Sequence, residues 1–111
     1  MLIEHAVIDF FLKKIGYKHG DGTFTPGGSL ANMSALILAR NEKIPAIKKK
    51  GMSATKKQMT AYISDQGHYS MIKAADMIGI GRENVRIIKS DSHGKMDIAA
   101  LEATIKADIQ K

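Results

Sequence analysis

Two short stretches of this chain hold residue types that could bind a small anionic ligand with a flat ring. The first is a glycine-rich turn, Gly27-Gly28-Ser29, which leads directly into an apolar segment with helical spacing. The first turn of a helix leaves backbone N–H groups unpaired at the positive end of the helix dipole, so this junction could hold a phosphate. The second stretch, Ser64-Asp-Gln-Gly-His-Tyr-Ser70, follows a strand-like segment. The ring of His68 could stack there on a flat heteroaromatic ligand.

Each stretch also has a purely structural explanation. Gly27 and Gly28 could serve only to allow a tight turn, with Ser29 capping the helix. The spacing from Gly22 to Ser29 is close to that of the nucleotide-binding P-loop, but Gly28 stands where that motif needs lysine. Because that lysine supplies charge to the outer phosphates, we do not expect a triphosphate. A lone histidine such as His68 is, by type alone, more often structural than functional.

Composition indicates one globular domain and excludes several chemistries. The chain has 111 residues, of which 44% are hydrophobic and 25% charged. It has no cysteine, so disulfides and thiolate nucleophiles are excluded. The four histidines lie far apart without i, i+4 pairing, and we expect no metal site. No segment resembles a signal peptide or is long enough to span a membrane, so the expected location is cytoplasmic, without a membrane partner.

The net charge of +6 comes from one part of the chain. Six of the 17 Lys and Arg residues are lysines in this part, and the other 11 basic residues are balanced by the 11 acidic ones. We interpret this part as a solvated loop, with no nucleic-acid partner, because no aromatic residues interleave with the lysines. The lysines concerned are Lys43, Lys48, Lys49, Lys50, Lys56 and Lys57.

The segments around the two stretches predict helices and a small parallel sheet. Apolar residues at helical spacing predict an amphipathic helix over 3–15 that ends at Gly16. Phe24 is expected to be the inward residue of a very short strand. The helix expected over 29–41 is apolar nearly all round, which is typical of a helix buried on most sides. A chain this small offers little to bury it with, so we expect the chain to be part of something larger.

The second half of the chain predicts a βαβ unit. Strands are expected over 59–64 and 85–89, with a helix over 71–78 between them, so the sheet should be parallel with a right-handed crossover. A parallel sheet needs cover on both faces. Asp91–Lys95 is expected to form a turn, and Asp97 to cap a last helix with Leu101 and Ile105 on one face. The fold class is therefore α/β.

Together the motifs resemble the group II pyridoxal-phosphate-dependent amino-acid decarboxylases, which include the glutamate, cysteine-sulfinate, diaminobutyrate and aromatic amino-acid decarboxylases. The resemblance covers nearly the whole chain, in the family's order and spacing. It implies that residues 1–111 are the early part of the large, cofactor-binding domain of a fold-type-I enzyme, a parallel sheet with flanking helices. The motifs are Thr25-Pro-Gly-Gly-Ser-Leu-Ala-Asn-Met33, Ser64-Asp-Gln-Gly-His-Tyr-Ser70, Lys73-Ala-Ala and Gly79-Ile-Gly-Arg-Glu-Asn-Val85.

The resemblance implies pyridoxal 5′-phosphate as cofactor and assigns roles by position. Gly28 and Ser29 match the positions that bind the cofactor phosphate. His68 matches the histidine that stacks on the pyridine ring, which makes it the candidate catalytic residue. Gln66 and Ser70 lie in the same motif and are further candidates for lining the site.

The resemblance also implies an amino-acid carboxy-lyase, usually a homodimer, with a lean toward an acidic substrate such as glutamate. The family's cofactor lysine and its aspartate for the pyridine nitrogen lie downstream of the matched motifs. His93-Gly-Lys95 aligns with a turn and does not replace them. We therefore expect the 111 residues alone to be inactive. Two alternatives stay open: another lyase of the same fold and cofactor, and a non-catalytic fragment that acts by association.

Overall fold

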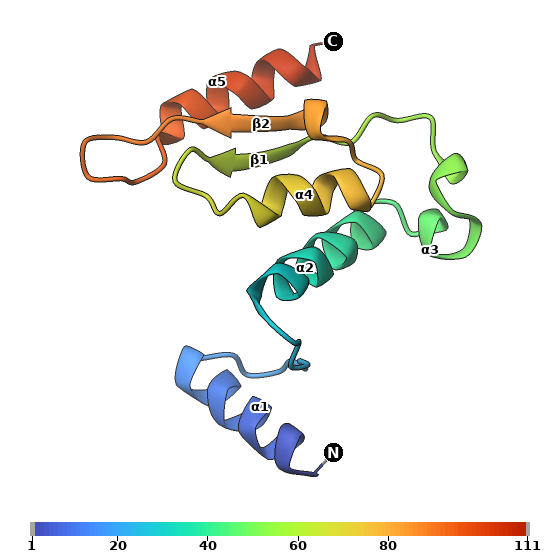
Figure 1. The fold of residues 1–111 in the computed structure, drawn as a ribbon, viewed down its shortest axis with the longest axis vertical. Coiled ribbons are helices and arrows are strands. Elements are labelled where there is room, and N and C mark those ends of the chain that lie inside the picture. Colours follow the sequence, from blue (N-terminus) through green and yellow to red (C-terminus); the bar gives the residue numbers. More distant parts are fainter. Residues whose placement is uncertain (1, 111) are drawn as a thin grey trace.

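A two-stranded parallel sheet with helices beside it forms the centre of the fold (Figure 1). The computed structural model describes residues 2–110. In chain order the elements are α1 (Leu2–Ile15), α2 (Gly28–Lys43), α3 (Ala46–Lys50), the 3-10 turn η1 (Met52–Ala54), β1 (Ala61–Ser64), α4 (Ser70–Met77), the 3-10 turn η2 (Arg82–Asn84), β2 (Val85–Ile88) and α5 (Ile98–Ile109).

Strands β1 and β2 and helix α4 form the predicted βαβ unit. The strands pair in parallel, from Ala61 opposite Val85 to Ser64 opposite Ile88. Helices α4 and α5 lie on opposite sides of the strand pair in Figure 1. Because the two strands are parallel, their carboxyl ends lie at the same end of the sheet, next to the start of α4.

The core lies where α4 meets α2 and the two strands. Ala75, Ile78 and Ile80 are buried there, and the partly buried Met33 and Leu36 of α2 pack against them. The Arg40 guanidinium at the end of α2 donates a 2.6 Å hydrogen bond to the Ile78 carbonyl. Helices α2 and α4 are thereby fixed to each other, which matters because each begins at one of the two candidate stretches.

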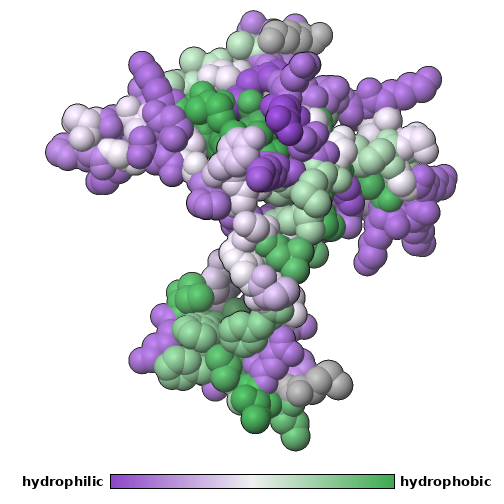
Figure 2. Space-filling model, in the orientation of Figure 1, coloured by the Kyte–Doolittle hydropathy of each residue, from purple (hydrophilic) through white to green (hydrophobic). Residues whose placement is uncertain are grey.

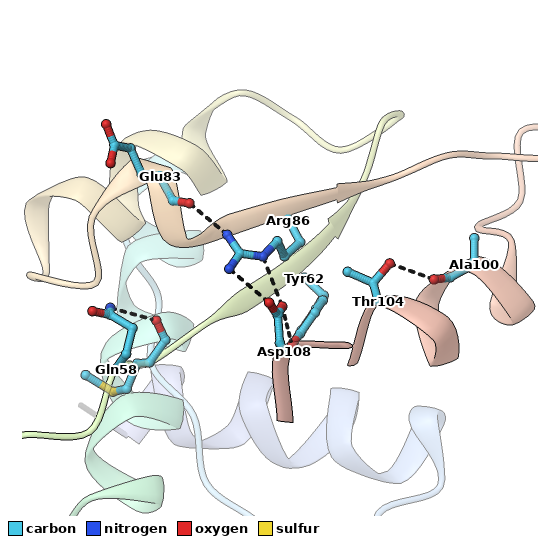
Figure 3. Close-up of polar contacts among 8 residues, drawn as sticks. Gln58, Tyr62, Glu83, Arg86, Ala100, Thr104 and Asp108 are labelled. Carbon is cyan, nitrogen blue, oxygen red and sulfur yellow. Dashed lines mark hydrogen bonds and ion pairs between the residues drawn. The ribbon is translucent and has the colours of Figure 1, made fainter. Parts of the chain in front are cut away.

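A polar cluster attaches α5 to the sheet (Figure 3). Asp108 of α5 accepts hydrogen bonds from the Tyr62 hydroxyl, at 3.0 Å, and from Arg86 Nε and Nη2, both at 3.0 Å. Burial, followed by the hydrogen bond to Asp108, raises the pKa of Tyr62 above its ordinary value. At the other end of α5, Asp97 accepts from the Ala100 N–H and caps the helix, as predicted.

Helix α1 has the predicted extent but covers little of the rest of the fold. It lies apart from the sheet in Figure 1, and Ile8 is its buried residue. Hydrophobic side chains gather on this part of the surface (Figure 2), and Phe10 and Phe11 are about half exposed. The short strand expected around Phe24 was wrong, because the structure assigns no strand there and leaves Phe24 59% exposed.

Helix α2 is less buried than its composition predicts. None of its residues is buried by the rest of residues 2–110, and Leu38 is 71% exposed. Within residues 2–110 the helix packs mainly against α4, which fits the expectation that a chain this small offers little to bury it with.

The lysine-rich segment differs from the solvated loop that the sequence predicts, because part of it is helical. Its lysines are exposed, but α3 forms in it and Ile47 is buried. The turn at Asp91–Lys95 is confirmed, because the Asp91 carboxylate accepts from the N–H groups of His93 and Lys95. No helix within residues 2–110 combines the length and apolar character needed to cross a membrane.

Candidate functional site

The glycine turn positions the start of α2. Gly27 adopts φ 107° and ψ 159°, a backbone conformation that is essentially restricted to glycine. Helix α2 begins at Gly28, and among residues 2–110 no side chain caps it. Ser29 lies inside the first turn, so it does not act as the cap that the structural explanation required. The first-turn N–H groups and the Ser29 hydroxyl therefore remain at the positive end of a 16-residue helix.

The second stretch is anchored at the start of α4 by a buried serine. Ser70 is only 6% exposed. Its Oγ lies 2.7 Å from His68 Nδ1, and its backbone N–H donates to the same nitrogen at 3.1 Å. Asn32 of α2 donates from Nδ2 to Ser70 Oγ at 2.8 Å. The exposed imidazole of His68 is thus connected through Ser70 to the helix that carries the glycine turn.

One pocket brings the two stretches together. It has a volume of about 290 Å³ and lies between the first part of α2 and the length of α4. Lys73 contributes a positive charge to this pocket, and its ammonium group lies 5.3 Å from the centre of the Tyr69 ring. The lining residues are Pro26, Ser29, Leu30, Met33, Ser70, Lys73, Ala74 and Met77.

A polar network at the carboxyl edge of the sheet supports the loop that carries His68. Both oxygens of the Asp65 carboxylate accept from Ser90, one from its hydroxyl and one from its N–H, the latter at 3.2 Å. Ser64 Oγ lies 3.2 Å from Ser90 Oγ. The hydrogen bonds from Ser90 lower the pKa of Asp65 below its ordinary value of 3.8. This network joins the ends of β1 and β2 directly before the loop.

The structure brings together some of the predicted site residues. Ser29 and Ser70 line the same pocket, and His68 is hydrogen-bonded to Ser70 but is not itself among the lining residues. Gly28 begins the helix beside it. Gln66 lies in the exposed turn after β1, its N–H donating to Ser64 Oγ at 3.1 Å, and it is not among the residues that line the pocket. Their roles toward a cofactor stay predictions.

Sequence reasoning missed Asn32 and the pairing of Asp65 with Ser90. Asn32 had a recognisable signal, because it is a polar residue one helical turn after Ser29 in a mainly apolar part of the helix. The contact between Asp65 and Ser90 spans 25 positions, and no local pattern predicts it.

Comparison with known proteins decides the family. Residues 4–111 match the family described as pyridoxal-dependent decarboxylase conserved domain. The chain belongs to the pyridoxal-dependent decarboxylase family. The human acidic amino acid decarboxylase GADL1 is 45% identical over 105 residues, which are 95% of this chain and 20% of the relative. Cysteine sulfinic acid decarboxylase of Rattus norvegicus is 38% identical over 95% of this chain and 21% of its own length.

Solved structures of this family share the fold. The crystal structure of mouse CSAD superimposes with a TM-score of 0.91 at 36% identity, covering 98% of this chain and 23% of that one. The glutamate decarboxylase domain of a Vibrio parahaemolyticus protein gives a TM-score of 0.86 at 28% identity, covering 96% and 24%. These matches confirm the predicted family and the α/β class. The chain spans about a fifth of the length of the curated relatives it matches.

Proposed function

We propose that this chain supplies the phosphate-binding and ring-stacking part of a pyridoxal-phosphate-dependent amino-acid decarboxylase. One observation carries the proposal. Ser29, at the free start of α2, and Ser70, which holds His68, line the same pocket. An anion-binding start of α2 and an aromatic ring held just before α4 match the phosphate and the pyridine ring of this cofactor.

The residues present fit the cofactor's chemistry. A Cβ built on Gly28 would meet no protein atom within 4 Å, so a phosphate can approach the backbone closely at this point. The side chain of Ser29 adds a hydroxyl donor and Lys73 adds a positive charge near the same pocket. The imidazole of His68 is exposed, which leaves a face available for stacking.

Each of these groups has a definite role in binding. When bound, pyridoxal phosphate supplies an electron-accepting ring for the loss of a carboxylate. The N–H groups at the start of α2 and the Ser29 hydroxyl hold the phosphate by charge-assisted hydrogen bonds. His68 fixes the plane of the ring, and Ser70 keeps the imidazole from rotating. Gln66 could reach the site only from the exposed turn after β1.

The resemblance implies that the lysine that binds the cofactor covalently and the aspartate that pairs with its ring nitrogen lie downstream of the matched motifs. Lys95 lies in the turn before α5, where its N–H donates to Asp91. We therefore propose that residues 1–111 alone do not catalyse decarboxylation. Release of carbon dioxide by the purified 111-residue chain would contradict this.

We further propose an acidic amino-acid substrate and a homodimeric enzyme. The substrate class follows from the names of the relatives, an acidic amino acid decarboxylase and a cysteine sulfinic acid decarboxylase. The exposed apolar side chains of α1 and α2 support association with further protein, because they have no cover within residues 2–110.

The test uses the protein expressed from its complete reading frame. We expect the purified protein to bind pyridoxal phosphate, seen by its visible absorbance, and to release carbon dioxide from glutamate, aspartate or cysteine sulfinate. Alanine at His68 should lower the rate strongly, whereas His93→Ala, in the exposed turn, should not. A protein that binds no pyridoxal phosphate, or that is equally active with His68→Ala, would contradict the proposal.

A further inference from the structure

A short series of hydrogen bonds determines which nitrogen of His68 can carry a proton. The Ser70 N–H can only donate, and it donates to His68 Nδ1 at 3.1 Å. Nδ1 must therefore offer its lone pair. In a neutral imidazole only one ring nitrogen carries hydrogen, so the proton lies on Nε2.

The Ser70 hydroxyl strengthens this preference because of Asn32. Asn32 Nδ2 donates to Ser70 Oγ at 2.8 Å, which occupies a lone pair of that oxygen. The hydroxyl hydrogen is then directed at His68 Nδ1, 2.7 Å away. Ser70 is 6% exposed, so water does not compete easily for these bonds.

We propose that Asn32 is a positioning residue that acts through Ser70 to hold His68 in one ring orientation and in the Nε2–H tautomer. Asn32 lies on the same face of α2 as Ser29, one turn further on. Helix α2 thus carries the anion-binding site at its start and, through Asn32 and Ser70, positions the ring of His68. The use of this orientation for a bound cofactor depends on the proposed function, whereas the tautomer itself does not.

The isosteric variant Asn32→Asp tests the proposal. An aspartate keeps the shape but replaces the amide donor with an acceptor. The Ser70 hydroxyl then donates to the new carboxylate, and its oxygen faces Nδ1 as an acceptor. Losing one net hydrogen bond of ordinary strength should lower the ratio of Nε2–H to Nδ1–H tautomer about fivefold.

The readout is nuclear magnetic resonance of the cofactor-free protein from its complete reading frame, labelled with ¹⁵N at histidine. Two-bond ¹H–¹⁵N correlations distinguish the tautomers, and His68→Phe assigns the signals of His68. Asn41→Asp, on the same helix, is the matched control. We expect Nε2–H in the parent and control proteins and a shifted ratio in Asn32→Asp. Ser70→Ala, which deletes only the hydroxyl, should shift the ratio in the same direction.

The outcomes separate this inference from the proposed function. A His68 ring that is mainly Nδ1–H in the parent, or a ratio that Asn32→Asp leaves unchanged, overturns the inference even if pyridoxal phosphate binds. A ratio that responds to both variants upholds it even if the protein binds no cofactor. Circular dichroism of each variant establishes that it is folded.

Discussion

The hydroxyl of Tyr62 provides a direct test of how α5 is held on the sheet. Tyr62→Phe removes one 3.0 Å hydrogen bond to the Asp108 carboxylate and leaves the ring in place. A hydrogen bond to a charged group contributes about 1.5–3 kcal/mol. Asp108 still accepts from Arg86, and Tyr62 is only partly buried, so the lower end of this range applies. A loss of about 1.5 kcal/mol corresponds to roughly tenfold easier opening of α5.

Amide hydrogen exchange of residues 98–109 measures this opening locally, which matters because the global unfolding of a longer protein need not be two-state. We expect about tenfold faster exchange in α5 of Tyr62→Phe and little change in α2. The matched control is Tyr69→Phe, since Tyr69 is 54% exposed and keeps its ring next to Lys73. Unchanged exchange in α5, or an equal acceleration in the control, would show that the Asp108 cluster does not hold the helix.

Three further predictions concern the candidate site. Ser29→Ala should weaken the binding of pyridoxal phosphate at least about tenfold, because it removes a hydroxyl donor to a dianion, while Ser53→Ala should not; equal affinities in a fluorescence titration would refute it. For His68→Ala, spectroscopic titration should show weaker binding as well as a slower reaction, and normal affinity would argue against stacking. Because the pKa of Asp65 is lowered, its carboxylate stabilises the fold above about pH 4 and this contribution disappears as pH falls through the lowered pKa. Asp65→Asn should therefore destabilise the protein at neutral pH and make no difference in acid, as measured by denaturation across pH; a constant difference would contradict the assignment.

The sequence predicts local structure well wherever a single element carries the signal. The parallel pairing of 61–64 with 85–88 follows from the strand–helix–strand pattern, and the cap at Asp97 follows from residue type and spacing. The paired motifs around Ser29 and His68 predict the family, and the comparisons confirm it.

The sequence does not predict which side chains of separate elements bond to each other. The bonds from Asn32 to Ser70 and from Tyr62 to Asp108 join positions 38 and 46 residues apart. Such pairs depend on how helices pack, which no local pattern encodes. The sequence predicts that α2 needs cover on most sides but not what supplies it, since composition reports what a helix can bury and not what is present to bury it.

A structure of the protein, expressed from its complete reading frame and bound to pyridoxal phosphate, tests the central claim most directly. We predict that the phosphate lies within hydrogen-bond distance of Ser29 Oγ and the N–H groups at the start of α2, with the pyridine ring stacked on His68. A phosphate bound at any other element, or a pyridine ring without contact to His68, would contradict the account.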